Sequence, residues 1–262
     1  MPSSDVSAAV AVGGIVIVVV ALWLHFYLQP QYFMELIQAC FDRNQVIFFS
    51  ETATAARKSD KICRPRVALT IDDAPTQHSH ALLDVLKRHD VKATFFVISG
   101  LVPGREDVLN RMVEEGHELA NHTQFDTASW MLSQETFESA LMHCERTLAT
   151  YQPPPVAEIE PHTFKWFRPG HGIFTTQMLQ TLKKQNYRVA LGNCFPNEAN
   201  GWWKGQCNSP WINSIYLNCR VRAGCIVVVH DREWTIDTFE RCLEGLSQRF
   251  TIGTLSSLVR AP

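Results

Sequence analysis

Two features that would point to common binding modules are missing from this sequence. None of the eight cysteines lies three residues from another, so there is no Cys-x-x-Cys pair. A cysteine-based zinc module or a thioredoxin-like site therefore has little support. The 24 basic and 26 acidic residues nearly cancel, and no long run of one sign occurs. We therefore expect no nucleic-acid partner and a neutral or weakly charged substrate.

The N-terminal segment has no charged side chain from Val6 to Met34. As a helix, its most apolar part, residues 8–28, would span roughly 30 Å, about the thickness of a bilayer's hydrocarbon core. A cleaved signal peptide is the alternative, but it usually has a basic start and a shorter apolar core. We predict an N-terminal tail and single-pass membrane anchor over residues 1–29, followed by a lumenal or extracellular domain. Arg43 is the one nearby basic residue, so charge says little about orientation.

The rest of the chain alternates short apolar strands with amphipathic helical patterns. The strand-like VALTI at residues 67–71 precedes a helical pattern at 81–90 and the strand-like KATFFVIS at 92–99. Such alternation predicts parallel strands joined by crossover helices, in a barrel or an open doubly wound sheet. We expect one large α/β domain over residues 45–262, with residues 30–44 as a membrane-proximal connector and an irregular region over residues 193–218.

Polar residues follow four of the predicted strands directly. They are Asp72 and Asp73 after VALTI, NHTQFD at residues 121–126 after HELA, RPGHG at residues 168–172 after FKWF, and His230 with Asp231 after CIVVV. Function in α/β folds concentrates at the carboxyl ends of the strands, so we expect these groups at one edge. A lone histidine at a strand end is more often a hydrogen-bonded core residue. Carboxylates, imidazoles and a guanidinium together indicate a metal-assisted hydrolase.

The motifs TIDDAP, GHELANHTQFD, WFRPGHG, VVVHD and RFTIGTLSSL occur in this order along the chain. This order resembles that of the polysaccharide deacetylase family, the NodB-homology carbohydrate esterases, and its chitin-deacetylase-like branch in particular. The resemblance covers nearly the whole chain after residue 45. It implies a distorted (β/α) barrel and metal-dependent removal of N-acetyl groups from amino-sugar glycans such as chitin or peptidoglycan. It also implies a divalent metal ion, Zn²⁺ first and Co²⁺ or Mn²⁺ as alternatives.

The resemblance assigns roles position by position. Asp72 matches the catalytic base, which takes a proton from a water molecule that the metal activates, and Asp73 and His122 match metal ligands. Arg168 matches the arginine that orients the catalytic aspartate. His230 matches the general acid that protonates the leaving amine, a role that suits an imidazole. The ordinary alternatives are a surface ion pair for Arg168 and a hydrogen-bonded buried histidine for His230.

The largest departure from the family pattern is at the third metal ligand. The histidine expected four residues after His122 is replaced by Asp126. A carboxylate oxygen can bind Zn²⁺ at about 2.0–2.2 Å, so an Asp73, His122 and Asp126 site stays chemically reasonable, with a shift toward metals that favour oxygen. The alternative is that Asp126 caps a nearby helix or turn.

Substrate contacts are less defined. The RPGHG motif places Pro169 and His171 beside Arg168, where the resemblance implies a substrate-binding position and an aromatic residue that His171 replaces. His171 lines a substrate groove, offers its backbone N–H to an oxyanion, or is merely exposed by a glycine-rich turn. The family's fourth motif is not recognisable, and Trp202 in that region is our candidate for stacking on a sugar ring or for ordinary packing.

Two further functions stay open beside the deacetylase. Related folds cleave C–N bonds in substrates other than sugars, so a small amide is one alternative substrate. A glycan-binding domain that lost activity with the second histidine and the fourth motif is the other.

Overall fold

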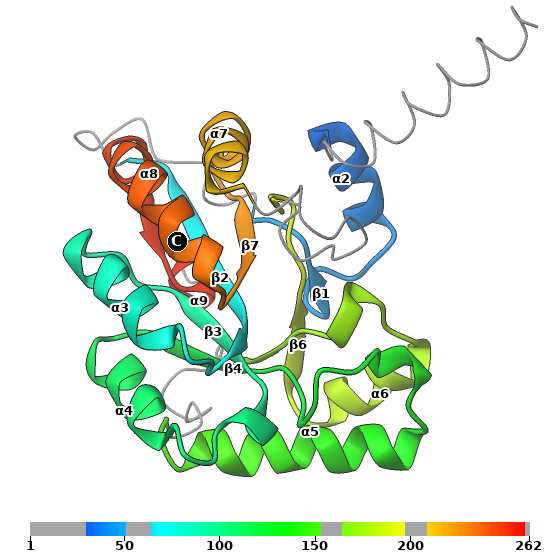
Figure 1. The fold of residues 1–262 in the computed structure, drawn as a ribbon. Helices are drawn as coiled ribbons and strands as arrows, with labels where there is room; N and C mark the ends of the chain where they lie inside the picture. Colours follow the sequence, from blue (N-terminus) through cyan, green and yellow to red (C-terminus); the bar gives the residue numbers. More distant parts are fainter. Residues whose placement is uncertain (1–29, 51–63, 153–163, 197–208, 260–262) are drawn as a thin grey trace, which may run out of the picture. The chain divides into compact units, whose positions relative to one another are not determined.

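The computed structural model describes residues 30–50, 64–152, 164–196 and 209–259 (Figure 1). The chain divides into two units, residues 1–41 and residues 42–262. In the first, helix α2 (Gln31–Ala39) lies within the predicted connector. None of the helices in the described ranges combines the length and apolar character that a membrane span requires. The predicted anchor falls on residues 1–29, outside the described residues, and the membrane partner stays a prediction.

The second unit is built on a parallel sheet. Its strands are β1 (Val46–Ile47), β2 (Arg66–Ala74), β3 (Thr94–Val97), β4 (Glu118–Asn121), β5 (Lys165–Phe167), β6 (Tyr187–Ala190), β7 (Ile226–His230) and β8 (Thr251–Gly253). They lie in the order β1, β6, β5, β4, β3, β2, β7, with β8 paired to the start of β2, and all these pairs are parallel. The alternation of strands and helices predicted this arrangement.

The two ends of the sheet approach each other through irregular links. Phe49, just after β1, forms an antiparallel bridge with Cys225, just before β7, and Cys194, after β6, forms a parallel bridge with Val227 in β7. A sheet that curls until its first and last strands meet is a barrel. Because these links are isolated bridges rather than a full ladder, the fold is consistent with the distorted (β/α) barrel that we expected.

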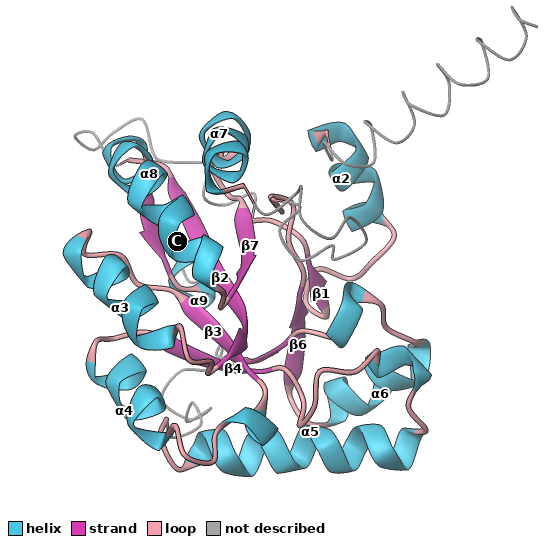
Figure 2. Cartoon of the chain, viewed as in Figure 1, coloured by secondary structure: helices cyan, strands magenta, loops and turns pink. Residues whose placement is uncertain are grey.

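Helices surround the strands in the second unit (Figure 2). They are α3 (Ser79–Arg88), α4 (Glu106–Glu114), α5 (Gln134–Ala149), α6 (Thr176–Lys184), α7 (Pro210–Arg220), α8 (Glu233–Arg249) and α9 (Leu255–Val259), with 3₁₀ turns η2 (Ser99–Leu101), η3 (Ser129–Met131) and η4 (Gly170–Gly172). Ser133 and Thr175 cap α5 and α6 with side-chain oxygens, as such residues do at N-caps.

Helix α7 corrects our expectation of an irregular region over residues 193–218. Its buried face includes Asn213 and Ser214, whereas Trp211, Ile212 and Ile215 are exposed. The usual amphipathic pattern is therefore partly inverted, and the polar residues in the sequence do not mark the solvent side. This inversion hid the helix from sequence analysis.

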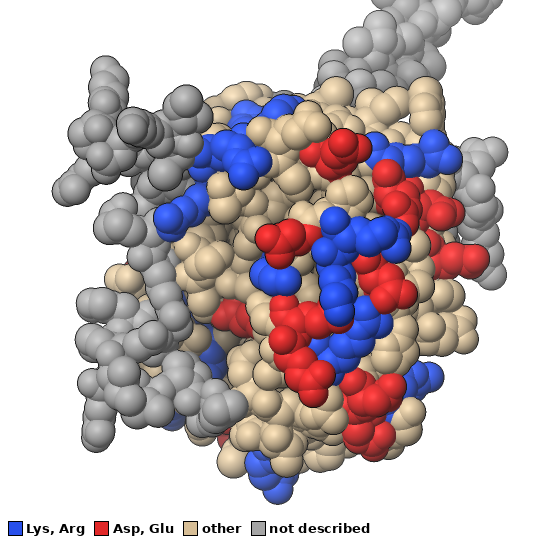
Figure 3. Space-filling model, turned by 90° about the vertical axis from the view of Figure 1, so that its left-hand side faces the viewer, with Lys and Arg blue, Asp and Glu red and all other residues tan. Residues whose placement is uncertain are grey.

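The core lies between the sheet and its helices and includes five fully buried phenylalanines, Phe95, Phe96, Phe137, Phe167 and Phe239. The outer face formed by α3, α4 and α8 carries surface ion pairs, such as Arg111 with Asp84 and Arg88 with Glu240. Figure 3 shows acidic and basic side chains interspersed there rather than gathered by sign.

Candidate active site

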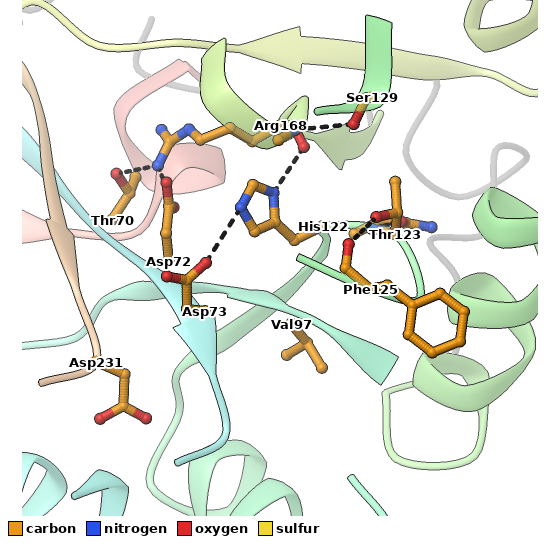
Figure 4. Close-up of polar contacts among 12 residues, drawn as sticks. Thr70, Asp72, Asp73, Val97, His122, Thr123, Phe125, Ser129, Arg168 and Asp231 are labelled. Carbon is orange, nitrogen blue, oxygen red and sulfur yellow. Dashed lines mark hydrogen bonds and ion pairs between the residues drawn. The ribbon is translucent and has the colours of Figure 1, made fainter. Parts of the chain in front are cut away.

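The end of β2 directs its two carboxylates to different partners. Thr70 and Asp72 lie two residues apart on the strand and both contact Arg168, as strand alternation requires. Asp73 would then face the opposite way, but its backbone is left-handed, with φ of 64°, and the pairing with β3 is irregular between Ile71 and Ala74. Asp73 therefore turns toward His122 while Asp72 stays with Arg168 (Figure 4).

Arg168, directly after β5, is the buried anchor of this region. Its Nη1 donates to Asp72 Oδ1 at 2.5 Å and to Thr70 Oγ1 at 2.8 Å, and its Nε donates to the Ala190 carbonyl at 2.9 Å. The guanidinium carbon lies 4.1 Å from the ring centre of Phe96. Burial lowers the pKa of Arg168, and the charge of Asp72 opposes that change. These hydrogen bonds hold the guanidinium group of Arg168 in a single orientation, with Nη1 directed at Asp72.

His122, directly after β4, is held through its other ring nitrogen. Its Nδ1 lies 2.7 Å from the backbone carbonyl of Arg168, and a carbonyl oxygen only accepts, so Nδ1–H is the donor. Its Nε2 consequently faces Asp73 Oδ1 at 3.5 Å. Burial lowers the pKa of His122, but the hydrogen bond with Asp73 and the charges of Asp72 and Asp73 together raise it.

The gap between His122 Nε2 and Asp73 Oδ1 calls for a cation. The two atoms are 3.5 Å apart and each presents a lone pair to the other. Either a proton on the nitrogen or a divalent ion between the two atoms would stabilise this arrangement. Ligands of a tetrahedral Zn²⁺ at about 2.0–2.1 Å each lie roughly 3.3 Å apart, close to the observed separation. Metal-bound histidines also commonly donate their second ring N–H to a carbonyl, as His122 does. Asp73 and His122 therefore fit a metal ion.

The other oxygen of Asp73 has a partner that sequence analysis missed. Arg232 Nη2 donates to Asp73 Oδ2 at 2.6 Å. Burial raises the pKa of Asp73, but the hydrogen bond with His122 and the charges of His230, His122 and Arg232 outweigh it, so the pKa of Asp73 lies well below its usual value. Its position in the sequence could have identified Arg232 as a candidate site residue, because it directly follows His230 and Asp231 at a strand end.

His230 and Asp231 lie at the end of β7, beside β2. His230 pairs with Asp72 in the strand register, and its ring packs edge-on against Phe195 at 5.9 Å. Asp231 is fully buried and accepts hydrogen bonds from the Thr76 backbone N–H at 3.0 Å and from the Ser79 hydroxyl. His230 thus lies next to Asp72 across the β2–β7 ladder. Asp231 points away from Asp72 and Arg168 (Figure 4), and its contacts with Thr76 and Ser79 fix the start of α3.

Asp126 does not join Asp73 and His122. Its side chain is exposed, and across the part of the chain that the structure describes no three histidine, cysteine or acidic side chains cluster as a metal site would. The predicted set of three ligands is therefore brought together only as a pair. The ligand role of Asp126 stays a prediction that requires the loop after β4 to bring it inward.

The predicted substrate contacts have mixed surroundings. Pro169 is buried, whereas His171 is exposed in a left-handed conformation, with φ of 63°. Trp202 lies outside the described residues. Exposed apolar side chains follow the ends of β4 and β5, and sequence analysis did not identify them; they are Phe125, Trp130, Met131 and Ile173.

A cavity of about 350 Å³ lies elsewhere, lined by residues of β4, β5 and α5, such as Glu118, Trp166 and Glu145. Asn121 of the NHTQFD motif lines it, but among the described residues none of the predicted catalytic, metal-binding or substrate-binding residues does. Cavity size alone therefore does not mark the chemistry in this fold, and the cluster of charged groups is the better guide.

Known proteins resemble this chain over most of its length. The family model for polysaccharide deacetylases matches residues 59–190. A chitooligosaccharide deacetylase from Bradyrhizobium sp. is 28% identical over 196 residues, which cover 74% of this chain and 83% of that protein. A peptidoglycan-N-acetylglucosamine deacetylase from Bacillus cereus is 25% identical over 200 residues, covering 74% of this chain and 88% of that protein.

The fold also matches solved structures. A CE4 family pseudoenzyme from Bacillus anthracis superposes with a TM-score of 0.68 at 20% identity, covering 83% of this chain and 70% of that chain. At this identity the match supports the fold alone.

Proposed function

Because this chain belongs to the polysaccharide deacetylase family, we propose that it is a metal-dependent hydrolase that removes N-acetyl groups from amino-sugar glycans. The observation that carries this proposal is the pairing at the end of β2. Asp72 is held by Arg168, and its neighbour Asp73 faces His122 Nε2 at 3.5 Å. This pairing supports a role in proton transfer for Asp72 and a role in holding a cation for Asp73.

Amide hydrolysis needs a base for the attacking water and an acid for the departing nitrogen. We assign the base to Asp72, whose Oδ1 is fixed by Arg168 so that the other oxygen is left to take the proton of the water. We assign the acid to His230, its neighbour across the β2–β7 ladder, which gives a proton to the amine as the C–N bond breaks. The products are acetate and the free amino sugar.

A metal held by Asp73 and His122 would supply a Lewis acid that polarises the acetamide carbonyl and acidifies the water. His122 is kept in position by the Arg168 carbonyl, so Arg168 serves both halves of the site. Its backbone orients the ligand, and its side chain orients the base.

The names of the similar proteins support the substrate class, since they act on chitooligosaccharides and on peptidoglycan N-acetylglucosamine. A sugar chain also suits the exposed aromatic side chains after β4, Phe125 and Trp130, because aromatic faces stack on sugar rings. We therefore favour an N-acetylated oligosaccharide over a small amide.

One observation favours a second candidate, a glycan-binding domain without turnover. Asp126 is exposed and lies outside the pair of fitted ligands. A site with two protein ligands would hold its ion weakly, and loss of the ion would leave binding without hydrolysis.

The two candidates are separated by measuring acetate released from chitooligosaccharides and from acetylated peptidoglycan fragments, with Zn²⁺, Co²⁺ and Mn²⁺ supplied separately. The deacetylase proposal expects release that depends on metal, together with metal in the purified protein that disappears in Asp73→Ala. No release from any substrate with any of the three metals, together with retained oligosaccharide binding, would favour the binding domain.

A further inference from the structure

Arg232 reaches back from the start of α8 to the carboxylate that faces His122. Its Nη2 donates to Asp73 Oδ2 at 2.6 Å, and its Nη1 donates to the Asp231 carbonyl at 3.0 Å. The two contacts fix the guanidinium against Asp73 from the β7 side. The family roles given above for the acid, the base and the ligands do not include this residue.

The contact divides the oxygens of Asp73 between two partners. Oδ1 faces His122, whereas Oδ2 is taken by Arg232. A metal ion can then reach the carboxylate through Oδ1 alone while the ion pair stands. Binding through both oxygens requires Arg232 to leave.

Each carboxylate at the end of β2 already faces a guanidinium group. Arg168 offsets Asp72 and Arg232 offsets Asp73, and Asp126 adds no charge to the cluster because it lies outside it. A divalent ion on Asp73 would thus meet a neighbouring guanidinium. Charges of +2 and +1 about 5 Å apart in a water-like medium repel enough to weaken binding roughly tenfold.

Arg232 is also more accessible to solvent than Arg168 is. The side chain of Arg232 is 32% exposed, whereas that of Arg168 is 4% exposed. Arg232 can therefore turn into solvent more readily than Arg168 can. From these contacts we propose that Arg232 is a positioning residue that acts as a built-in counter-ion, competing with the divalent metal for Asp73 and setting the metal affinity of the site. The inference rests on the metal of the proposed function.

The test is the dissociation constant for Zn²⁺ and for Mn²⁺ of the full-length chain after a chelator has removed bound metal. Arg232→Gln removes the charge and should tighten binding roughly tenfold, whereas Arg232→Lys keeps the charge and should stay within a few-fold of the parent. Arg88→Gln, at the far end of α3 in a surface pair with Glu240, makes the same change in net charge and should leave the affinity unchanged.

A second measurement covers the case in which Arg232→Gln lowers stability. The rise in melting temperature on adding Zn²⁺ reports affinity through binding to the folded state, and it should be larger for Arg232→Gln than for the parent. Binding by Arg232→Gln but not by the parent would also support the competition.

Equal or weaker binding by Arg232→Gln, with no larger rise in melting temperature, would overturn the inference and leave the deacetylase proposal standing if the parent binds metal. Absence of metal binding in the parent and in Arg232→Gln alike would overturn the inference and the metal in the proposed function together.

Discussion

Arg168 and Asp72 form an ion pair in which both side chains are almost entirely buried, with 2.5 Å between Nη1 and Oδ1. The pair joins β5 to β2 at the edge of the sheet where the candidate site lies. Removal of one partner leaves the other charge buried and unpaired, which typically costs about 3–5 kcal/mol.

We therefore predict that Arg168→Met lowers the free energy of unfolding by about 3–5 kcal/mol in urea denaturation. Adding Asp72→Asn to this variant removes the stranded charge, so the double variant should be more stable than Arg168→Met alone. Equal stability of the single and double variants would mean that the ion pair does not dominate at this position, and that the contacts of Arg168 with backbone carbonyls matter more.

The second prediction concerns Asp126. If the loop after β4 brings this carboxylate to the metal, Asp126→Ala should weaken Zn²⁺ binding markedly, and Asp126→His should restore it and favour Zn²⁺ over Mn²⁺. Calorimetric titration of the metal-free protein measures both effects. An alanine variant with the parent's affinity would assign Asp126 to the loop, with no part in metal binding.

The third prediction links pH to stability through His117, a buried residue directly before β4. Burial, and next the charge of Lys92, lower the pKa of His117 to about 4. An unfolded histidine titrates near 6.5, so between these values the unfolded chain binds a proton that the folded chain does not. Stability contributed by neutral His117 is therefore present above about pH 6.5 and is lost as the pH falls toward 4, up to roughly 3 kcal/mol.

The variant His117→Asn isolates this effect. The Ala93 backbone N–H donates to His117 Nδ1 at 3.1 Å, and an asparagine oxygen offers an acceptor in a similar place. The loss of unfolding free energy between pH 7.5 and pH 4.5 should be smaller in His117→Asn than in the parent, whereas His89→Asn should retain the full loss. An identical pH dependence in His117→Asn and the parent would show that His117 does not carry it.

The parallel strands and most helices were predictable because the two kinds of element leave different patterns in the sequence. A buried strand is a short continuous apolar run, whereas an amphipathic helix has apolar residues three or four positions apart. The convergence of Asp72, His122 and Arg168 was predictable for the related reason that carboxyl ends of parallel strands share an edge. Helix α7 was not predictable, since its buried Asn213 and Ser214 and its exposed Trp211 break that pattern, although Tyr216 and Leu217 on the same helix are buried as expected.

The fine geometry of the site depends on backbone and tertiary detail that spacing does not encode. Strand alternation alone would place the adjacent carboxylates of Asp72 and Asp73 on opposite faces, but the left-handed backbone at Asp73 turns its carboxylate toward His122. The match to the family pattern four residues after His122 predicted Asp126 as a ligand; the loop after β4 leaves its side chain exposed, and its ligand role stays a prediction. Arg232 reaches Asp73 across 159 positions of sequence, a contact that only the β2–β7 pairing creates.

The proposed hydrolysis depends on Asp72 as the base, and the Asp72→Asn variant tests that role. Asparagine keeps the shape of the side chain but cannot take the proton, so acetate release from an N-acetylated chitooligosaccharide should fall by roughly 10²- to 10⁴-fold. Metal and oligosaccharide binding, measured on the same preparation, should persist. If Asp72→Asn binds metal and oligosaccharide and still releases acetate nearly as fast as the parent, Asp72 is not the base.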